Sequence, residues 1–267
     1  MSRDQLPSTV LHAFGVEGPA RRLDGGQGDS WAADDLVFKP DGGPLQEWLA
    51  GALAEVTPDG FRIAEPVCTR DGAWVSHGWS ATRWVEGSEP DYSAVSTWRD
   101  ILAAGRAFHR AVAHLGRPDF LEARQDWWAR ADRAVWGEQE IQFRPEFAAV
   151  ARRLRGALEP LGRPQLVHGD LTKNVLFAPG LAPAVIDISP YWRPPQYAEG
   201  VVVADALCWH GAPATLWKTV DVPVAAVARA LLFRMATTNE RVAAGADGVD
   251  LRDEARRYGL AAAAIGL

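Results

Sequence analysis

The sequence is short of cysteine and of long apolar runs. Its 267 residues include two cysteines, Cys68 and Cys208, in unlike contexts, which excludes a disulfide framework and the ligand spacing of a zinc site. No stretch of about 18 uninterrupted apolar residues occurs, so we expect no membrane span. The beginning of the sequence holds no apolar run of signal-peptide length. These absences predict a cytoplasmic protein with reduced cysteines.

Positive charge is not in excess either. The formal net charge is -6, so no general basic field favours nucleic acid as a partner. Hydrophobic residues make up 48% and charged residues 23% of the chain, which is the composition of an ordinary globular protein with a sizeable core. There is no internal repeat and no low-complexity tract. We therefore expect a folded protein that binds neither nucleic acid nor a membrane.

The first third of the chain has the pattern of short strands around one helix. Trp31–Ala33 and Leu36–Lys39 flank a two-residue turn, which predicts a β-hairpin. Pro44 then opens a helix pattern with apolar residues at three- and four-residue spacing. Strand-like runs follow at Phe61–Val67 and Ala73–Val85. This part of the chain predicts a small β-rich lobe.

After Gly87 the pattern changes to long amphipathic helices. Apolar residues recur at helical spacing from Val95 to Val112. Four later segments repeat this spacing: Asp126–Trp136, Pro145–Leu158, Val224–Val242 and Leu251–Ala264. A β-rich segment at Gln165–Ser189 interrupts them. We predict an α+β, two-lobed fold, with a β-rich lobe over residues 1–86 and a larger, mainly helical lobe over residues 87–267.

The strongest functional signal is His168-Gly169-Asp170, with Asn174 four residues later and Asp187 beyond. Apolar runs at 175–177 and 184–186 are joined by turn residues, which predicts a β-hairpin. A symmetric antiparallel pairing sets Asn174 opposite Asp187 at the open end of the hairpin. An amide oxygen and a carboxylate there could share one Mg²⁺, which prefers oxygen ligands. Asp170, in the loop before the hairpin, could reach the same cavity from the substrate side.

These residues resemble the catalytic loop and the metal-binding aspartate of the aminoglycoside phosphotransferase-like branch of the protein-kinase fold. The resemblance covers most of the chain, and the whole pattern is similar to an uncharacterised actinobacterial branch of these proteins. It implies that Asp170 positions or deprotonates the acceptor and that Asn174 and Asp187 hold Mg²⁺. It also implies that His168 anchors the catalytic loop and that Asp205 braces it.

The resemblance reaches the N-terminal lobe more weakly. Gly25, Gly26 and Gly28 resemble a shortened glycine-rich phosphate loop that lacks the full spacing. Small residues in such a loop let backbone N–H groups approach phosphate oxygens. Lys39 resembles the strand lysine that binds the phosphates of ATP, and Glu47 on the next helix would then be its ion-pair partner.

Each N-terminal residue also has a plain structural interpretation. Lys39 could be a surface lysine at the end of a strand, and the glycines could form an ordinary turn. Glu47 could face solvent, with Glu55 two turns later in its place. The acidic residues near the end of the chain form a solvated face by default, although they could bind a cationic substrate. They are Glu240, Asp247, Asp250, Asp253 and Glu254.

The segment after Asp187 departs from the antibiotic kinases of the family, which place acidic or glycine-rich residues there. It carries Tyr191, Trp192 and Arg193 together with three prolines. Aromatic rings supply flat apolar walls, and a guanidinium binds anionic or carbonyl groups. We predict that these three residues wall the acceptor pocket. They favour a neutral or zwitterionic acceptor over a polycationic aminoglycoside.

Together these patterns predict an enzyme that uses ATP and Mg²⁺ to phosphorylate a hydroxyl or amino group of a small molecule. One alternative is a nucleotide-binding pseudokinase that acts as a scaffold or sensor, which the weak glycine loop favours. Another is a protein kinase, although the short stretch from Asp187 to Asp205 leaves little room for a peptide-docking segment. The acceptor, the choice between ATP and GTP, and the oligomeric state are left open by the sequence.

Overall fold

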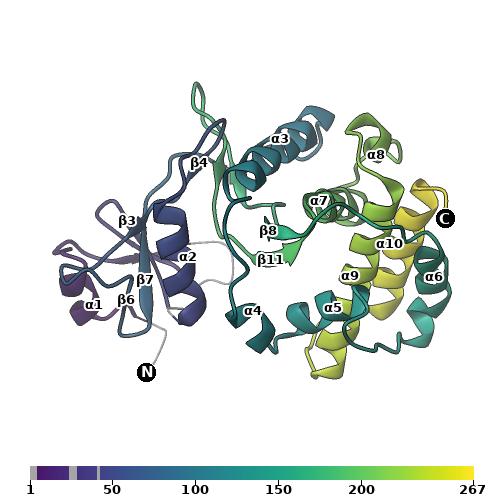
Figure 1. The fold of residues 1–267 in the computed structure, drawn as a ribbon, viewed down its shortest axis with the longest axis horizontal. Coiled ribbons are helices and arrows are strands. Elements are labelled where there is room, and N and C mark those ends of the chain that lie inside the picture. Colours follow the sequence, from purple (N-terminus) through teal and green to yellow (C-terminus); the bar gives the residue numbers. More distant parts are fainter. Residues whose placement is uncertain (1–4, 24–28, 41–42) are drawn as a thin grey trace.

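The computed structural model describes residues 5–23, 29–40 and 43–267. The predicted phosphate loop at Gly25, Gly26 and Gly28 lies outside the described residues. Within the described residues the chain forms a β-rich N-terminal lobe and a mainly helical C-terminal lobe (Figure 1). The predicted α+β, two-lobed fold is confirmed.

An antiparallel sheet forms the N-terminal lobe. Its order within the described residues is β1-β2-β3-β7-β5, with β6 paired to β7. The strands are β1 (Arg21–Arg22), β2 (Trp31–Ala33), β3 (Leu36–Lys39), β5 (Pro66–Val67), β6 (Val75–Ser76) and β7 (Trp79–Arg83). The predicted hairpin is confirmed, because Ala33 pairs with Leu36 across its turn.

Two helices accompany this sheet. Helix α1 (Ser8–Ala13) places Val10 in a small apolar core with Phe38 and Trp79 of the sheet. Helix α2 (Pro44–Ala54) begins at the predicted proline. Its buried Leu49 and Leu53 belong to the large core that continues into the helical lobe. Helix α2 therefore links the sheet to the rest of the molecule.

The helical lobe carries the large core. Its helices are α3 (Val95–Ala111), α4 (Phe120–Ala123), α5 (Trp127–Val135), α6 (Pro145–Gly156), α7 (Pro195–Trp209), α8 (Leu216–Thr219), α9 (Val224–Ala243) and α10 (Leu251–Ala264). The five amphipathic segments predicted after Gly87 appear as α3, α5, α6, α9 and α10. Helix α7 packs closely against α9, because a Cβ at Gly200 would lie 2.4 Å from the carbonyl oxygen of Ala226.

Two strand pairs lie between the lobes. Strand β8 (Gln165–His168) pairs with β11 (Pro190–Arg193), and β9 (Val175–Leu176) pairs with β10 (Ala184–Val185). The predicted hairpin is present, but its predicted register is wrong by one residue. Leu176 pairs with Ala184, and Ile186 donates its N–H to the carbonyl of Asn174, so Asp187 lies one residue beyond.

The shift in register has a visible cause at Phe177. Its N–H and C=O both bond to Ser88, each at 3.0 Å, so its backbone is not free to pair across the hairpin. The carbonyl of Pro183 on the other side accepts the N–H of Arg62 at 2.7 Å. On its first strand the hairpin ladder therefore ends at Leu176, one residue earlier than a symmetric pairing predicts.

A strand from the first third of the chain joins this hairpin. The predicted strand at Phe61–Val67 divides into β4 (Arg62–Ile63) and β5, and β4 pairs in parallel with β10. The boundary predicted at residue 87 stays a prediction.

Among the described residues, no helix combines the length and apolar character needed to cross a bilayer.

Candidate functional site

Three polar residues gather where the two strand pairs end. Asp170 follows the last residue of β8, and Asp187 precedes β11, which runs antiparallel to β8. Asn174 precedes β9 and Asp187 follows β10, its antiparallel partner. Each pairing therefore brings its two polar residues to the same end of the ladder. The topology brings Asp170, Asn174 and Asp187 to neighbouring strand ends, although Asp170 and Asp187 line two different cavities and not the single cavity expected from the sequence.

His168 fastens the loop that carries Asp170. Its ring Nδ1 accepts the N–H of Asp170 at 3.1 Å, so the ring proton lies on Nε2, which donates to the carbonyl of Ile186 at 3.1 Å. His109 of α3 in turn accepts the backbone N–H of His168 at 3.1 Å through Nε2. Both rings are buried, and burial lowers the pKa of His168 and lowers that of His109 to about 3. Two neutral histidines thus connect the loop to α3 and to β10.

Asn174 is oriented by a second contact. Its Nδ2 donates to the carbonyl of Asp170 at 2.6 Å. Because the amide nitrogen is used in this way, the amide oxygen is the atom left for a cation. Asp187 adopts a left-handed backbone conformation, with φ +50°, which aspartate tolerates better than most residues. Asn174 and Asp187 thus offer hard oxygen donors of the kind that Mg²⁺ prefers.

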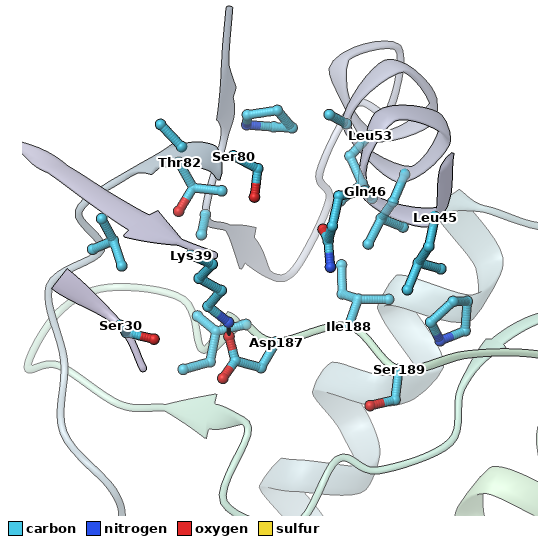
Figure 2. Close-up of a pocket in the computed structure, with 18 of the residues that line it drawn as sticks. Ser30, Lys39, Leu45, Gln46, Leu53, Ser80, Thr82, Asp187, Ile188 and Ser189 are labelled. Atoms are coloured by element: carbon cyan, nitrogen blue, oxygen red, sulfur yellow. Dashed lines mark hydrogen bonds and ion pairs between the residues drawn. The ribbon is translucent and has the colours of Figure 1, made fainter. Parts of the chain in front are cut away.

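Asp187 contacts Lys39 directly in an ion pair (Figure 2). Both side chains are partly exposed, at 28% for Lys39 and 41% for Asp187. They line a cavity of about 350 Å³ between β3, β7, α2 and the segment from Val185 to Pro190, which we call the Lys39 cavity. Among the described residues, no group of three or more His, Cys, Asp or Glu side chains could hold a metal ion alone. A metal here would need further oxygen ligands, such as phosphates.

Helix α2 presents Gln46, not Glu47, to the Lys39 cavity. Gln46 lines the cavity with Leu45 and Leu49, and Figure 2 shows its side chain pointing in from α2. Glu47 is exposed. The carboxylate that contacts Lys39 in this structure is that of Asp187. The pairing of Lys39 with Glu47 stays a prediction.

Asp170 opens into a different cavity, of about 640 Å³, which we call the Asp170 cavity. Its lining comes largely from α7, α9, α10 and the segment before α10. Its aromatic members include Trp128, Trp209 and Tyr258. Besides Asp170, the charged members among the described residues are Asp205, Asp250, Asp253, Glu254, Lys173, Arg234 and Arg241. The side chain of Asp170 is 43% exposed. A small molecule in this cavity would reach Asp170 without entering the Lys39 cavity.

The three residues predicted to wall the acceptor pocket line a third cavity. Tyr191, Trp192 and Arg193 line a cavity of about 240 Å³, and the described residues around it do not include Asp170. Arg193 is neutralised, because its guanidinium contacts Asp132 at 2.7 Å and Glu138 at 2.6 Å. An anionic acceptor therefore gains little from this guanidinium.

Tyr191 explains the glycine of the His-Gly-Asp segment. A Cβ at Gly169 would lie 2.4 Å from the Tyr191 ring, which the pairing of β8 with β11 places beside the loop. A side chain at position 169 would displace this ring. Tyr191 itself is buried, at 7% exposure. In this structure its ring packs under the catalytic loop.

One charged residue at the site has no counterpart in the sequence-based predictions. Arg234 of α9 contacts Asp170 at 2.8 Å and Asp205 at 2.6 Å. The sequence signal was available, because Arg234 interrupts the apolar run Leu231–Ala236, and a charge in such a run needs a partner. Asp205, predicted to brace the loop, lies at the other end of this contact.

Solved structures share this architecture over nearly the whole chain. A microcompartment-associated aminopropanol kinase aligns with a TM-score of 0.59 and 18% identity, over 96% of this chain and 94% of that chain. A choline/ethanolamine kinase family protein from Mesorhizobium loti gives 0.55 and 20%, over 95% and 90%. The apo form of aminoglycoside phosphotransferase APH(4)-Ia gives 0.56 and 16%, over 97% and 98%. These likenesses confirm the predicted kinase-like fold.

Sequence comparison agrees with the fold. No match was found among curated protein sequences. A model described as a phosphotransferase enzyme family matches residues 44–188, from the start of α2 through the predicted metal-binding aspartate. The match spans more than half of the 267 residues. The chain therefore belongs to this phosphotransferase enzyme family.

Proposed function

We propose that the protein transfers the terminal phosphoryl group of ATP, with Mg²⁺, to a hydroxyl or amino group of a small amine-bearing molecule. The observation that carries this proposal is the position of Asp170 and Asp187 at one end of the β8–β11 pair. Asp187 faces the Lys39 cavity and Asp170 faces the Asp170 cavity. A nucleotide and an acceptor in these two cavities would meet at the strand ends.

The residues divide the chemistry between them. Lys39 offers a positive charge to phosphate oxygens, while Asn174 and Asp187 offer oxygen ligands to a cation. When bound, Mg-ATP supplies the phosphoryl group, and the metal neutralises its negative charge. Asp170 accepts a hydrogen bond from the attacking group of the acceptor and takes its proton as the new bond forms. The use of ATP is supported by family structures solved with ADP or AMP-PNP.

The charge of the Asp170 cavity supports an acceptor that carries an amine. Its described lining holds five acidic residues against three cationic ones, Lys173, Arg234 and Arg241. Among the acidic residues, Glu254 is half-buried and forms no salt bridge with any described residue. Trp128 and Trp209 line the same cavity, and aromatic faces attract cations. The kinases of similar fold named for aminopropanol and for choline or ethanolamine act on acceptors of this kind, by their names. A small amino-alcohol therefore fits this cavity, and it remains within the neutral or zwitterionic class predicted from the sequence, although Arg193 is not the residue that supports it.

The chain outside the site adds two parts to the proposal. The actinobacterial branch rests on the sequence resemblance alone. The location in the cytoplasm rests on the sequence pattern and agrees with the two free cysteines.

Helix α7 begins at Pro195, soon after Asp187, so the segment where protein kinases dock peptides is short.

A panel of acceptors tests the proposal. ATP consumption is measured with 1-amino-2-propanol, ethanolamine, choline, spectinomycin and hygromycin B, for the wild type and for Asp170→Asn. We expect turnover with an amino-alcohol and a loss of roughly 10²–10⁴-fold in the variant, the usual contribution of a positioned acid–base group. Nucleotide binding by calorimetry should be unchanged. Binding of Mg-ATP without turnover on any acceptor would favour the pseudokinase alternative.

A further inference from the structure

A buried cation lies between two carboxylates beneath the Asp170 cavity. The guanidinium of Arg234 forms a fork on Asp205, with Nε to Oδ1 at 2.7 Å and Nη2 to Oδ2 at 2.6 Å. The same Nη2 donates to Oδ1 of Asp170 at 2.8 Å. The side chain of Arg234 is 14% exposed and that of Asp205 is 6% exposed. One guanidinium thus holds a buried carboxylate and the catalytic one together.

The charges of this cluster fix its protonation. Burial alone would lower the pKa of the Arg234 guanidinium, but Asp205 and Asp170 outweigh it and raise that pKa well above its ordinary value. The guanidinium therefore stays charged. A bidentate contact with one carboxylate already satisfies it electrostatically, and Asp205 supplies that contact from α7. The further contact from Arg234 to Asp170 is therefore not needed to neutralise the guanidinium.

That third contact determines which oxygen of Asp170 is available. Oδ1 accepts from Arg234, whereas Oδ2 accepts no hydrogen bond from any of the described residues. Asp170 lines the Asp170 cavity, and without Arg234 its carboxylate would be free to rotate about its terminal bond. With Oδ1 held, Oδ2 remains for the proton of an acceptor.

We propose that Arg234 is a positioning residue for the phosphoryl transfer, which aligns the Asp170 carboxylate through Oδ1 while Asp205 anchors the guanidinium. The proposal rests on the proposed function. It gives Asp205 a defined role, because this carboxylate acts on Asp170 through Arg234 and not by direct contact. It also assigns α9, which lies outside the matched part of the family model, to the catalytic machinery.

The test separates turnover from binding in variants of Arg234. Arg234→Met leaves Asp205 buried without a partner and can fail to fold, so it is paired with Asp205→Asn in a double variant that removes both charges. We expect the double variant to lower kcat about 10²-fold with the best acceptor of the panel, while KM for ATP changes less than twofold. Arg234→Lys restores one charged contact but no fork, and should recover roughly tenfold of that loss.

A matched control removes another ion pair of the same helix. Arg130 contacts Glu240 of α9 at 2.7 Å and lies outside the described lining of both cavities. Arg130→Met should keep kcat within twofold, with thermal unfolding recorded for every variant. If the double variant keeps the wild-type kcat, the positioning role is overturned and the proposed function stands. If the wild type itself shows no turnover on the panel, the proposed function fails and the role fails with it.

Discussion

The two lobes hold their functional groups in different ways. In the helical lobe, Asp170 is tied to Arg234, its loop is tied to His168, and His168 is fully buried. In the N-terminal lobe, Lys39 ends a short strand, and its ion pair with Asp187 is partly exposed on both sides. We infer that Asp170, the proposed proton acceptor, is fixed before any ligand binds. Lys39, the proposed phosphate-binding group, would take its final geometry from the nucleotide.

The largest expected effect lies where the two lobes meet. Asp187→Asn removes the carboxylate that Lys39 contacts and that we assign to the metal, so turnover of Mg-ATP should fall by about 10³-fold. The fold should persist, because asparagine tolerates a positive φ. Calorimetry with and without Mg²⁺, together with ATP consumption, measures both effects. Asp221→Asn is the matched control, since Asp221 is exposed and has a similar φ of +56°. Normal turnover in Asp187→Asn would refute the metal assignment.

A methyl group added in each lobe tests how rigid the lobes are. At Gly200 a Cβ would lie 2.4 Å from the backbone carbonyl of Ala226, whereas at Gly18 it would lie 2.3 Å from the side-chain carboxylate of Asp34. The backbone of α9 cannot move aside, but the exposed carboxylate can. Gly200→Ala should therefore cost about 3 kcal/mol and Gly18→Ala less than about 0.5 kcal/mol in free energy of unfolding. Urea titration of both variants measures this, and equal losses would contradict the contrast between lobes.

Acid should destabilise the helical lobe through its buried histidines. The pKa of His109 is lowered by burial to about 3, below the ordinary 6.5, so the unfolded state binds more protons between these values. Stability is therefore complete above pH 6.5 and falls as pH falls toward 3. We expect a loss of about 2 kcal/mol between pH 7.5 and pH 5.

A single substitution checks that source of acid sensitivity. His109→Gln keeps an acceptor for the N–H of His168 but cannot titrate, so its stability should depend less on pH. Urea titrations at pH 7.5, 6 and 5 compare the variant with the wild type. If the free energy of unfolding changes equally with pH in the variant and the wild type, groups other than His109 cause the acid sensitivity.

The smallest expected effect concerns neighbouring residues of α2. Gln46 lines the Lys39 cavity and Glu47 is exposed, so Gln46→Ala should raise KM for ATP a few-fold, equivalent to less than about 1 kcal/mol. Glu47→Ala should change KM by less than twofold. Steady-state kinetics on the two variants shows which of the two side chains contributes to KM for ATP. A larger effect at Glu47 would restore the ion pair predicted from the sequence and show that α2 turns when nucleotide binds.

Amphipathic patterns and spacing in the chain predicted most of the fold. Helices α3, α6 and α10 each bury one face and expose another, so their periods are visible in the sequence. Helix α7 is buried around almost its whole surface and shows no such period, which is why it was not predicted. The one-residue error in the hairpin came from Ser88, a distant residue whose bonds to Phe177 no local pattern indicates.

The candidate site was predictable where its residues are close together in the sequence. Asp170, Asn174 and Asp187 belong to one short stretch with recognisable spacing. Arg234 comes 64 positions after Asp170, and the contact between them depends on how α9 packs against α7. The wall of the Asp170 cavity depends on the same packing. For this reason the sequence suggested an acceptor pocket beside Tyr191, which is close to Asp187 in the chain, whereas the pocket that we propose lies at α10.

The parallel pairing of β4 with β10 has a mechanical consequence. The chain passes from sheet to helices near Gly87, but β4 attaches the N-terminal segment a second time, directly to the hairpin that ends at Asp187. Two attachments of the backbone constrain the sheet more than one, and the packing of α2 in the large core restricts it further. We therefore expect the remaining movement of the sheet to be a small rotation about the line that joins the two attachments. A displacement at β4 would be passed on, through β10, to Asp187.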